Sequence, residues 1–213
     1  MKLHRHYKNK PYRVYGIAKH SETLEDLVIY ETLYDNPTAK LWARPQAMFE
    51  ETVQIDGQEM PRFAEVPLKI EMFTAINSQE EAVLSILIRE IFGQWDPRWF
   101  HSNLRNHPRF HLLIASIDDQ PVGFKLGYEL DQWCFYSWLG GVMPAYRGLG
   151  IAADLIQAQQ DWCRAQGYRK IQTKTQNRWK SMLLLNIKMG FEIIGYHSSD
   201  EGGPKIVLEK TLV

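Results

Sequence analysis

The chain has 213 residues, of which 45% are hydrophobic, 23% charged and 12% aromatic, a composition that excludes a disordered or collagen-like protein. Lysine plus arginine and aspartate plus glutamate number 25 each, so no net charge favours nucleic acid or an anionic membrane as a partner. No apolar run reaches the ~18 residues of a membrane span, and no secretory signal is visible. Two cysteines, Cys134 and Cys163, are too few for a disulfide scaffold, which predicts reduced thiols and a cytoplasmic protein.

Residues 1–66 and 67–213 differ in pattern, and we expect them to be two domains. The first part contains short runs typical of strands, and Asp56-Gly57 is a strong hairpin-turn pair. The regular spacing of these runs predicts a small all-β, barrel-like domain. Its predicted strands are residues 12–17, 27–30, 41–43 and 52–55.

The second part alternates strands and helices, which predicts an α+β fold. Residues 110–117 and 122–128 flank a polar turn and are expected to form an antiparallel hairpin, followed by an aromatic-rich strand over 133–142. An apolar stripe indicates a helix from Ile151 to a cap at Gly167. The other predicted strands are 68–73, 171–175, 191–196 and 206–212, and the other predicted helices are 79–92, 97–103 and 181–189.

The most informative segment runs from Val142 to Ala152, where a buried strand ends, a glycine-containing turn follows and an amphipathic helix begins. Unpaired amides at a helix N-terminus suit an anion, above all a diphosphate, and Gly148 and Gly150 let the backbone approach its oxygens. The segment lacks the Gly-Lys-Ser/Thr of a P-loop and the third glycine of the dinucleotide fingerprint. It fits the pattern Arg-x-x-Gly-x-Ala over 147–152 in full.

This pattern resembles the acetyl-CoA-binding motif of the GNAT N-acetyltransferase superfamily, and Gly190-Phe191 sits where that family has it. The resemblance covers about residues 68–213 and implies a mixed sheet flanked by helices and splayed between its fourth and fifth strands. It also implies acetyl-CoA as cofactor, and an oxyanion-donating amide at a bulge near residues 139–141. The implied cofactor-binding residues are Val142 for pantetheine and Arg147, Gly148, Leu149, Gly150, Ile151 and Ala152 for the pyrophosphate.

Acetyl transfer to an amine needs a neutral nitrogen, and therefore a base or a desolvated site. Glu129 and Asp131 are the carboxylates nearest in sequence to the expected cleft, and they are the candidate bases. Proton removal through ordered water is the alternative. In many members of the family, a tyrosine four residues before Gly-Phe gives a proton to the departing CoA thiolate. In this sequence the position is occupied by Asn186, which cannot deliver a proton at neutral pH. Asn186 can still hydrogen-bond the sulfur or the pantetheine amide, so it is a candidate catalytic as well as cofactor-binding residue, and Asn177 is a further candidate for cofactor binding.

Other reactive residues have structural interpretations too. Cys134 is either a ping-pong nucleophile or, since no base lies nearby in sequence, a small core residue. The histidines lack metal-ligand spacing, so we expect no metal. Six aromatic residues either line an acceptor pocket or pack in the core: Trp95, Trp99, Phe100, Trp133, Tyr136 and Trp138.

Arg5-His6-Tyr7-Lys8 and Trp42-Ala43-Arg44-Pro45 resemble signatures of a bacterial domain-of-unknown-function family that spans residues 2–65 and implies no activity. These aromatic and basic side chains either form a ligand-reading groove, suited to single-stranded RNA or a modified base, or pack in a compact barrel.

The sequence therefore predicts an acetyl-CoA-dependent N-acetyltransferase that moves an acetyl group to a primary amine by direct attack in a ternary complex. The acceptor is a small molecule or a protein or peptide amine. Membranes and nucleic acid are not expected as partners, and a homodimer is left open. The alternative is a catalytically weak acyl-CoA sensor or module whose N-terminal domain recruits a partner.

Overall fold

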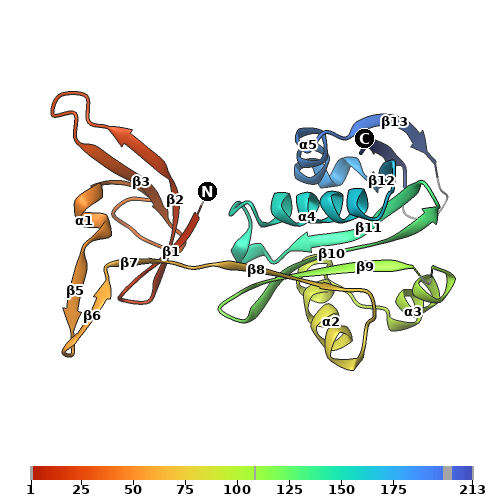
Figure 1. Cartoon of the computed structure of the whole chain (residues 1–213), viewed down its shortest axis with the longest axis horizontal. Coiled ribbons are helices and arrows are strands. Elements are labelled where there is room, and N and C mark those ends of the chain that lie inside the picture. Colours follow the sequence, from red (N-terminus) through yellow and green to blue (C-terminus); the bar gives the residue numbers. More distant parts are fainter. Residues whose placement is uncertain (1, 108, 199–202, 213) are drawn as a thin grey trace. The chain divides into compact units, whose positions relative to one another are not determined.

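Two compact units divide the chain, Met1–Leu68 and Lys69–Val213, and they are coloured in sequence order in Figure 1. The structure is a computed structural model that describes residues 2–107, 109–198 and 203–212. No helix in these described ranges is long and apolar enough to cross a bilayer.

The first unit is an antiparallel sheet with the strand order β4-β3-β2-β1-β7, as the pattern of short strands predicted. The strands are β1 (Lys2–His6), β2 (Lys10–Lys19), β3 (Asp26–Thr32), β4 (Leu41–Pro45) and β7 (Phe63–Glu65). A short helix, α1 (Gln46–Glu50), follows β4, and β5 (Thr52–Ile55) and β6 (Gln58–Pro61) form a separate hairpin. Asp56 and Gly57 both have positive φ, which is the geometry of the predicted two-residue turn.

Aromatic side chains fill the core of this unit. Val28, Tyr30, Phe49 and Phe63 are buried, and Phe49 stacks on Phe63 with ring centroids 4.1 Å apart. Trp42 packs against the same cluster. These rings pack against one another, which favours a packed core over a ligand-reading groove.

The second unit is a mixed sheet with the order β13-β14-β12-β11-β10-β9-β8. Its helices are α2 (Ser78–Phe92), α3 (Pro97–Asn106), α4 (Ile151–Ala165) and α5 (Lys180–Lys188). Its strands are β8 (Leu68–Phe73), β9 (Phe110–Ile117), β10 (Gln120–Asp131), β11 (Cys134–Val142), β12 (Lys170–Thr175), β13 (Glu192–His197) and β14 (Lys205–Thr211).

The two faces of this sheet carry separate hydrophobic clusters. Leu84 and Leu87 of α2 and Phe100 of α3 pack against one face, and Ile156 and Cys163 of α4 pack against the other. Figure 1 shows α4 on one side of β9 to β11 and α2 with α3 on the opposite side. The predicted α+β sheet flanked by helices is confirmed.

The sheet splits between β11 and β12, its fourth and fifth strands. These strands pair in parallel over Cys134–Ser137 and Lys170–Thr173, after which β11 continues without a pairing to β12 as far as Val142. The split leaves an open backbone edge of β11 inside the sheet, as the resemblance implied.

His111 on β9 is fully buried and stacks on Trp162 of α4, and neither ring nitrogen has a partner in the described chain. Burial lowers the pKa of His111 from 6.5 to about 4. Because the unfolded chain takes up this proton first, the free energy of unfolding should fall by about 3 kcal/mol as the pH drops from 6.5 to 4. Urea denaturation of wild type and His111→Phe between pH 6.5 and 4 checks this. The free energy of unfolding of the variant should lack this part of the pH dependence, and an identical pH dependence of the two proteins would contradict it.

Candidate active site

The turn between β11 and α4 is a short 3-10 turn, Pro144–Tyr146, followed by two glycines. The amide of Tyr146 donates to the Met143 oxygen at 2.9 Å, and that of Arg147 donates to the Pro144 oxygen at 3.3 Å. The amides of Ala153 and Asp154 donate to the Gly150 oxygen. The fold therefore uses the amides on both sides of the loop.

The amides of residues 148 to 152 have no hydrogen-bond partner within the described residues. Gly148 and Gly150 have φ of 77° and 91°, and a Cβ built on Gly150 meets no atom within 4 Å. Five donors at the N-terminus of α4 are thus left without a partner within the described residues, where the helix dipole favours an anion. The amide of Arg147, which the sequence placed in this group, is already bonded.

The guanidinium of Arg147 binds the protein itself. Its Nε donates to the Val142 oxygen at 3.1 Å, so this side chain ties the end of β11 to the loop. The Val142 oxygen therefore has a partner, and the amide of Val142 is the group left for a ligand.

The open edge of β11 presents alternate backbone groups to the split. The Met143 amide donates to the Val122 oxygen at 2.9 Å, and Val142 pairs with Gly123 in the next position. Since bonded and non-bonded pairs alternate along an antiparallel ladder, Val142 and Gly140 direct their amides away from β10. A bulge lies directly before this edge: Leu126 pairs with Leu139 and Gly127 with Ser137, which leaves Trp138 as the extra residue.

A small cavity of about 10 Å³, room for about one water molecule, lies between this part of β11 and the helices α4 and α5. Its lining includes Gly140 and Gly141 of β11, Ala152 and Leu155 of α4, and Met182 of α5. Asn186 lies one turn after Met182 on α5 and is 3% exposed. The helix register therefore puts Asn186 on the face of α5 that approaches the cavity.

Glu129 is held by two partners at the opposite end of β11. Its Oε2 accepts a hydrogen bond from the Tyr168 hydroxyl at 2.7 Å and from Arg109 at 3.0 Å. The Tyr168 hydroxyl, followed by Arg109, lowers the pKa of the Glu129 carboxyl. A carboxylate stabilised in this way is a weak base.

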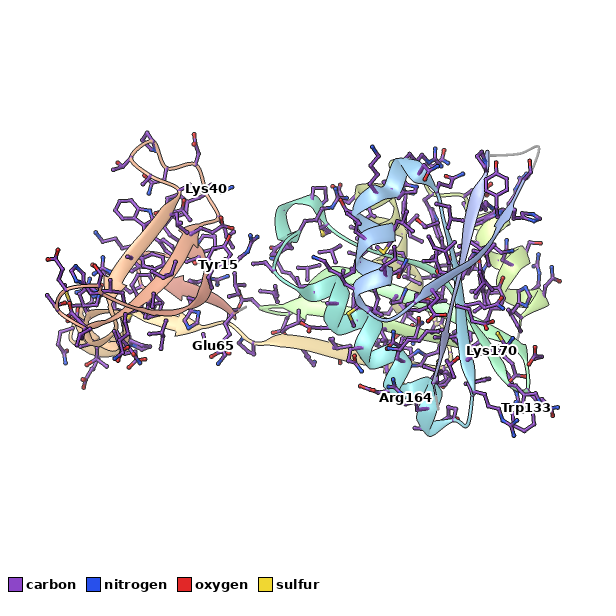
Figure 2. All side chains as sticks on the ribbon, turned by 90° about the horizontal axis from the view of Figure 1, so that it is seen from above. Tyr15, Lys40, Glu65, Trp133, Arg164 and Lys170 are labelled. Atoms are coloured by element: carbon purple, nitrogen blue, oxygen red, sulfur yellow. The ribbon has the colours of Figure 1, made fainter. Side chains whose placement is uncertain are left out.

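Asp131 closes the turn between β10 and β11. Its Oδ1 accepts the amides of Trp133 and Cys134 at 2.8 and 3.0 Å. Figure 2 labels Trp133 and Lys170 at this end, where Cys134 pairs with Lys170. The structure thus gives both candidate bases structural partners at the hairpin end of the sheet.

Loss of the Asp131 carboxylate should destabilise this turn. We expect Asp131→Ala to lower the free energy of unfolding by about 1 kcal/mol, the usual cost of removing a side chain that caps backbone amides. Asp131→Asn, which keeps an accepting oxygen, should lose less. Urea denaturation of both variants measures the difference, and equal losses would contradict this account.

The remaining candidates differ in accessibility. Asn177 begins a 3-10 turn after β12 and is exposed. Cys134 is 1% exposed, and burial raises its pKa to about 11, so its thiol stays protonated and is a poor nucleophile. The core interpretation of Cys134 fits the structure.

Several predicted acceptor aromatics gather on the α3 face of the sheet. Trp99 is 48% exposed and contacts Trp138 with ring centroids 5.1 Å apart, and Trp138 contacts Tyr128 at 5.7 Å. Phe100 is buried, and Trp133 lies under the guanidinium of Arg169 at the hairpin end. Trp99 and Trp138 are therefore the members best placed to contact an acceptor.

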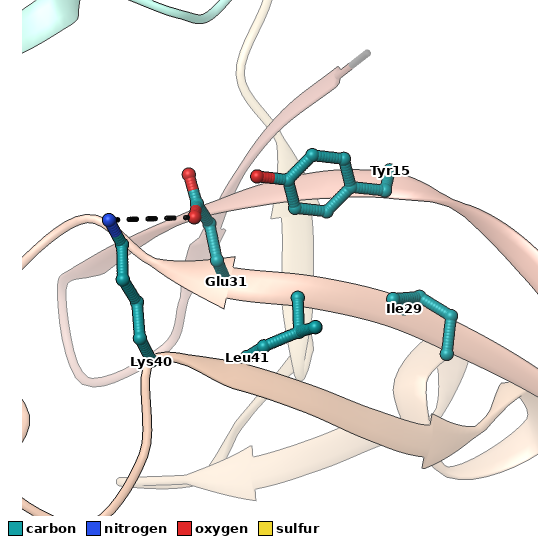
Figure 3. A pocket seen from close by; sticks show the side chains of 5 residues that line it. All are labelled: Tyr15, Ile29, Glu31, Lys40 and Leu41. Atoms are coloured by element: carbon teal, nitrogen blue, oxygen red, sulfur yellow. Dashed lines mark ion pairs between the residues drawn. The ribbon is translucent and has the colours of Figure 1, made fainter.

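The first unit has a hollow of its own, about 340 Å³ in volume, on the outer face of its sheet. Figure 3 shows Tyr15 and Lys40 on the two sides of the Glu31 carboxylate, and Leu41 and Ile29 along the rest of the hollow. Lys40 approaches Glu31 at 3.9 Å. Arg13 also pairs with Glu31. The negative charge of Glu31 is thus neutralised within the unit.

Lys125 on β10 is a candidate that the sequence reasoning missed. It is 8% exposed and lines the cavity beside Gly140. No hydrogen bond or ion pair joins it to another residue in the described ranges. The available signal was one charged residue inside the apolar run 122–126, where alternation places it on a buried face.

Comparison with known proteins identifies the two parts of the chain. Residues 80–191 match the model of the acetyltransferase (GNAT) family, and residues 2–65 match that of a protein of unknown function, DUF1653. The first match covers more than half of the 213 residues, and the chain belongs to the GNAT acetyltransferase family. Both predicted families are confirmed. No curated protein matches the chain.

Solved structures share the fold at low sequence identity. Ard1 from Thermoplasma volcanium is 15% identical over 68% of this chain and 98% of its own, with a TM-score of 0.59. The ribosomal-protein-S18-alanine N-acetyltransferase from Escherichia coli is 11% identical over 68% and 94%, with a TM-score of 0.57. A GNAT family acetyltransferase from Elizabethkingia anophelis with acetyl-CoA bound is 17% identical over 68% and 97%, with a TM-score of 0.56.

Proposed function

We propose that residues 69–213 form an acetyl-CoA-dependent N-acetyltransferase that moves an acetyl group to a primary amine in a ternary complex. The GNAT family acetyltransferase from Elizabethkingia anophelis, which shares the fold, has acetyl-CoA bound. The observation that carries the proposal is the row of five unpaired amides, residues 148 to 152, at the N-terminus of α4 beside the split in the sheet.

The loop and the open edge suit different parts of the donor. The five amides and the positive end of α4 would hold the diphosphate. The amide of Val142 would pair with the pantetheine arm, which thereby extends the sheet. The amide of Gly140, two residues closer to the bulge, would donate to the thioester oxygen and stabilise the negative charge that develops there.

The acceptor amine must lose a proton before or during attack. Neither Glu129 nor Asp131 is free for this step, since Tyr168 and Arg109 hold the first and two backbone amides hold the second. We therefore favour proton removal through water. Trp99 and Trp138 would contact the acceptor from the α3 face.

Two measurements test the proposal on the full chain. Calorimetry should detect CoA binding, and mass spectrometry should detect transfer from labelled acetyl-CoA to at least one member of an amine panel that includes peptides. Absence of CoA binding would contradict the cofactor assignment. Acetyl transfer to hydroxyl groups instead of amines would contradict the N-acetyl specificity.

A sensor that binds acyl-CoA without efficient transfer is the second candidate. It is favoured by Asn186, which cannot supply a proton, and by the structural partners of Glu129 and Asp131. Tight CoA binding with no transfer to any acceptor would support it. The recruiting role of residues 1–66 stays a prediction.

A further inference from the structure

Three polar side chains lie buried between the sheet and α4: Lys125, Ser137 and Gln159, here called the buried polar layer. Lys125 is 8% exposed, Ser137 1% and Gln159 0%. The Ser137 hydroxyl and both amide atoms of Gln159 have no hydrogen-bond partner among the described residues. Unpaired polar atoms are costly in a core, so this layer needs an explanation, and its member Lys125 also lines the cavity.

The backbone register brings the layer together. Ser137 pairs with Gly127, two residues along β10 from Lys125, and directly opposed residues share a face of the sheet. On α4, Leu155, which lines the cavity with Lys125, and Gln159 follow each other at four-residue spacing on one face. The same face continues to Cys163, whose thiol pKa is raised by burial, an effect that the charge of Lys125 partly opposes.

Gly140 leaves room for the stem of the Lys125 side chain. Gly140 pairs with Lys125, and a Cβ built on it would lie 3.4 Å from Lys125 Cγ and 3.1 Å from the Phe124 oxygen. The lysine therefore begins its course directly beside the residue whose amide we assign to the thioester oxygen. From there it lines the cavity that extends to Met182 of α5.

We propose that Lys125 is a catalytic residue that gives its proton to the sulfur of CoA as the thioester breaks. The inference rests on the proposed acetyltransferase function. It supplies the acid that Asn186 cannot be, since an asparagine amide has no proton to release near neutral pH.

The step balances without a further reactant. The acceptor nitrogen forms a bond to the acetyl carbon, the carbon–sulfur bond breaks and its electron pair stays on sulfur. A proton moves from Lys125 Nζ to this sulfur, which leaves CoA as a thiol and Lys125 as a neutral amine. The acceptor nitrogen releases its proton to water, and Lys125 regains one from water when the products leave.

The acidity of Lys125 suits this role. Burial lowers the pKa of its amine from 10.5 to about 8, close to the ~8.5 of a thiol, so transfer between the two is nearly balanced. The titratable group that faces it from α4 is Cys163, whose pKa burial raises to about 12. His111 on β9 lies on the same face and is neutral above its pKa of about 4.

The acid can be tested with CoA alone, through the ultraviolet absorbance of its thiolate. In wild type, the positive charge of Lys125 should lower the thiol pKa of bound CoA by about one unit or more relative to free CoA. In Lys125→Met, which fills the same volume without charge, this lowering should disappear. Equal thiol pKa values of CoA bound to the two proteins would overturn the proposal.

Lys210→Met is the matched control. Lys210 is also partly buried, but its Nζ donates to the Gln160 side chain and the Met189 oxygen at 2.6 and 2.8 Å, so it is held by the fold. This variant should keep the wild-type thiol pKa of bound CoA. Loss of the shift in Lys210→Met as well would overturn the assignment to Lys125.

Steady-state kinetics and peptide mass spectrometry provide a second test. Lys125→Met should lower kcat about a hundredfold with any acceptor that the panel identifies, at an unchanged KM for acetyl-CoA. Acetylation of Lys125 itself, detected by peptide mass spectrometry, would overturn the proposal because the amine would then act as a nucleophile. Failure of wild type to bind CoA would remove the proposed function along with this inference, whereas binding without the pKa shift removes the inference alone.

Discussion

Replacement of Gly150 by glutamate is expected to weaken CoA binding at least about a hundredfold, close to 3 kcal/mol. A Cβ on Gly150 meets no atom within 4 Å, so the new side chain finds space, and it brings a negative charge to the loop where the diphosphate is expected. Calorimetry on the folded variant measures the effect. Unchanged affinity would contradict the assignment of the loop.

Two variants separate the charge from backbone strain. Gly150→Ala carries the same strain at φ 91° without the charge, so it should lose less affinity than Gly150→Glu. Gly167, at the opposite end of α4, has φ 84° and equally open surroundings. Gly167→Glu should therefore lose similar stability and bind CoA as wild type does.

Lys125→Met is expected to raise the free energy of unfolding at pH 7 by about 3 kcal/mol. The folded pKa of Lys125, about 8, lies below the ordinary 10.5, so the unfolded chain binds this proton more tightly. In wild type the stability is full above pH 10.5, falls as the pH drops to 8 and stays reduced below. Lys125→Met has no amine to protonate, so it does not lose this free energy of unfolding.

Urea denaturation at pH 7 and pH 10.5 checks this expectation. The wild type should gain stability between these values, and Lys125→Met should lack that gain. Lys210→Met provides the contrast, because it removes a hydrogen-bonded lysine and should destabilise the protein. A Lys125→Met protein that is less stable than wild type at pH 7 would show that the lysine is compensated within the fold.

The parts of the fold with local sequence signals were predictable. The strands at residues 52–55, 68–73 and 110–117 have the predicted bounds, since each is an apolar or alternating run between turn residues. β1, β6 and β7 were missed. The histidine- and lysine-rich segment Lys2–His6 and the polar segment Gln58–Pro61 lack a strand pattern, and pairing with β2 and β5 makes them strands.

The candidate site was predictable where backbone geometry decides it and not where distant partners do. The glycines at 148 and 150 before an amphipathic helix indicated the loop. The hydrogen bond from the Arg147 amide to the Pro144 oxygen was not predictable, because it belongs to a 3-10 turn that has no sequence pattern of its own. Glu129 lies 39 residues from Tyr168, so its partner depends on the sheet order. Lys125 was overlooked because one charge in an apolar strand has no motif.

The split between β11 and β12 also limits how far a ligand can extend into the sheet. It is sealed at the hairpin end by four paired residues and opens toward the loop, so a slender chain can enter only lengthwise. From Val142 to the bulge at Trp138 the usable edge is five residues, about 16 Å at the usual rise per strand residue. The paired residues would therefore limit the depth of an inserted arm to the region of the bulge at Trp138, whatever acyl group the arm carries.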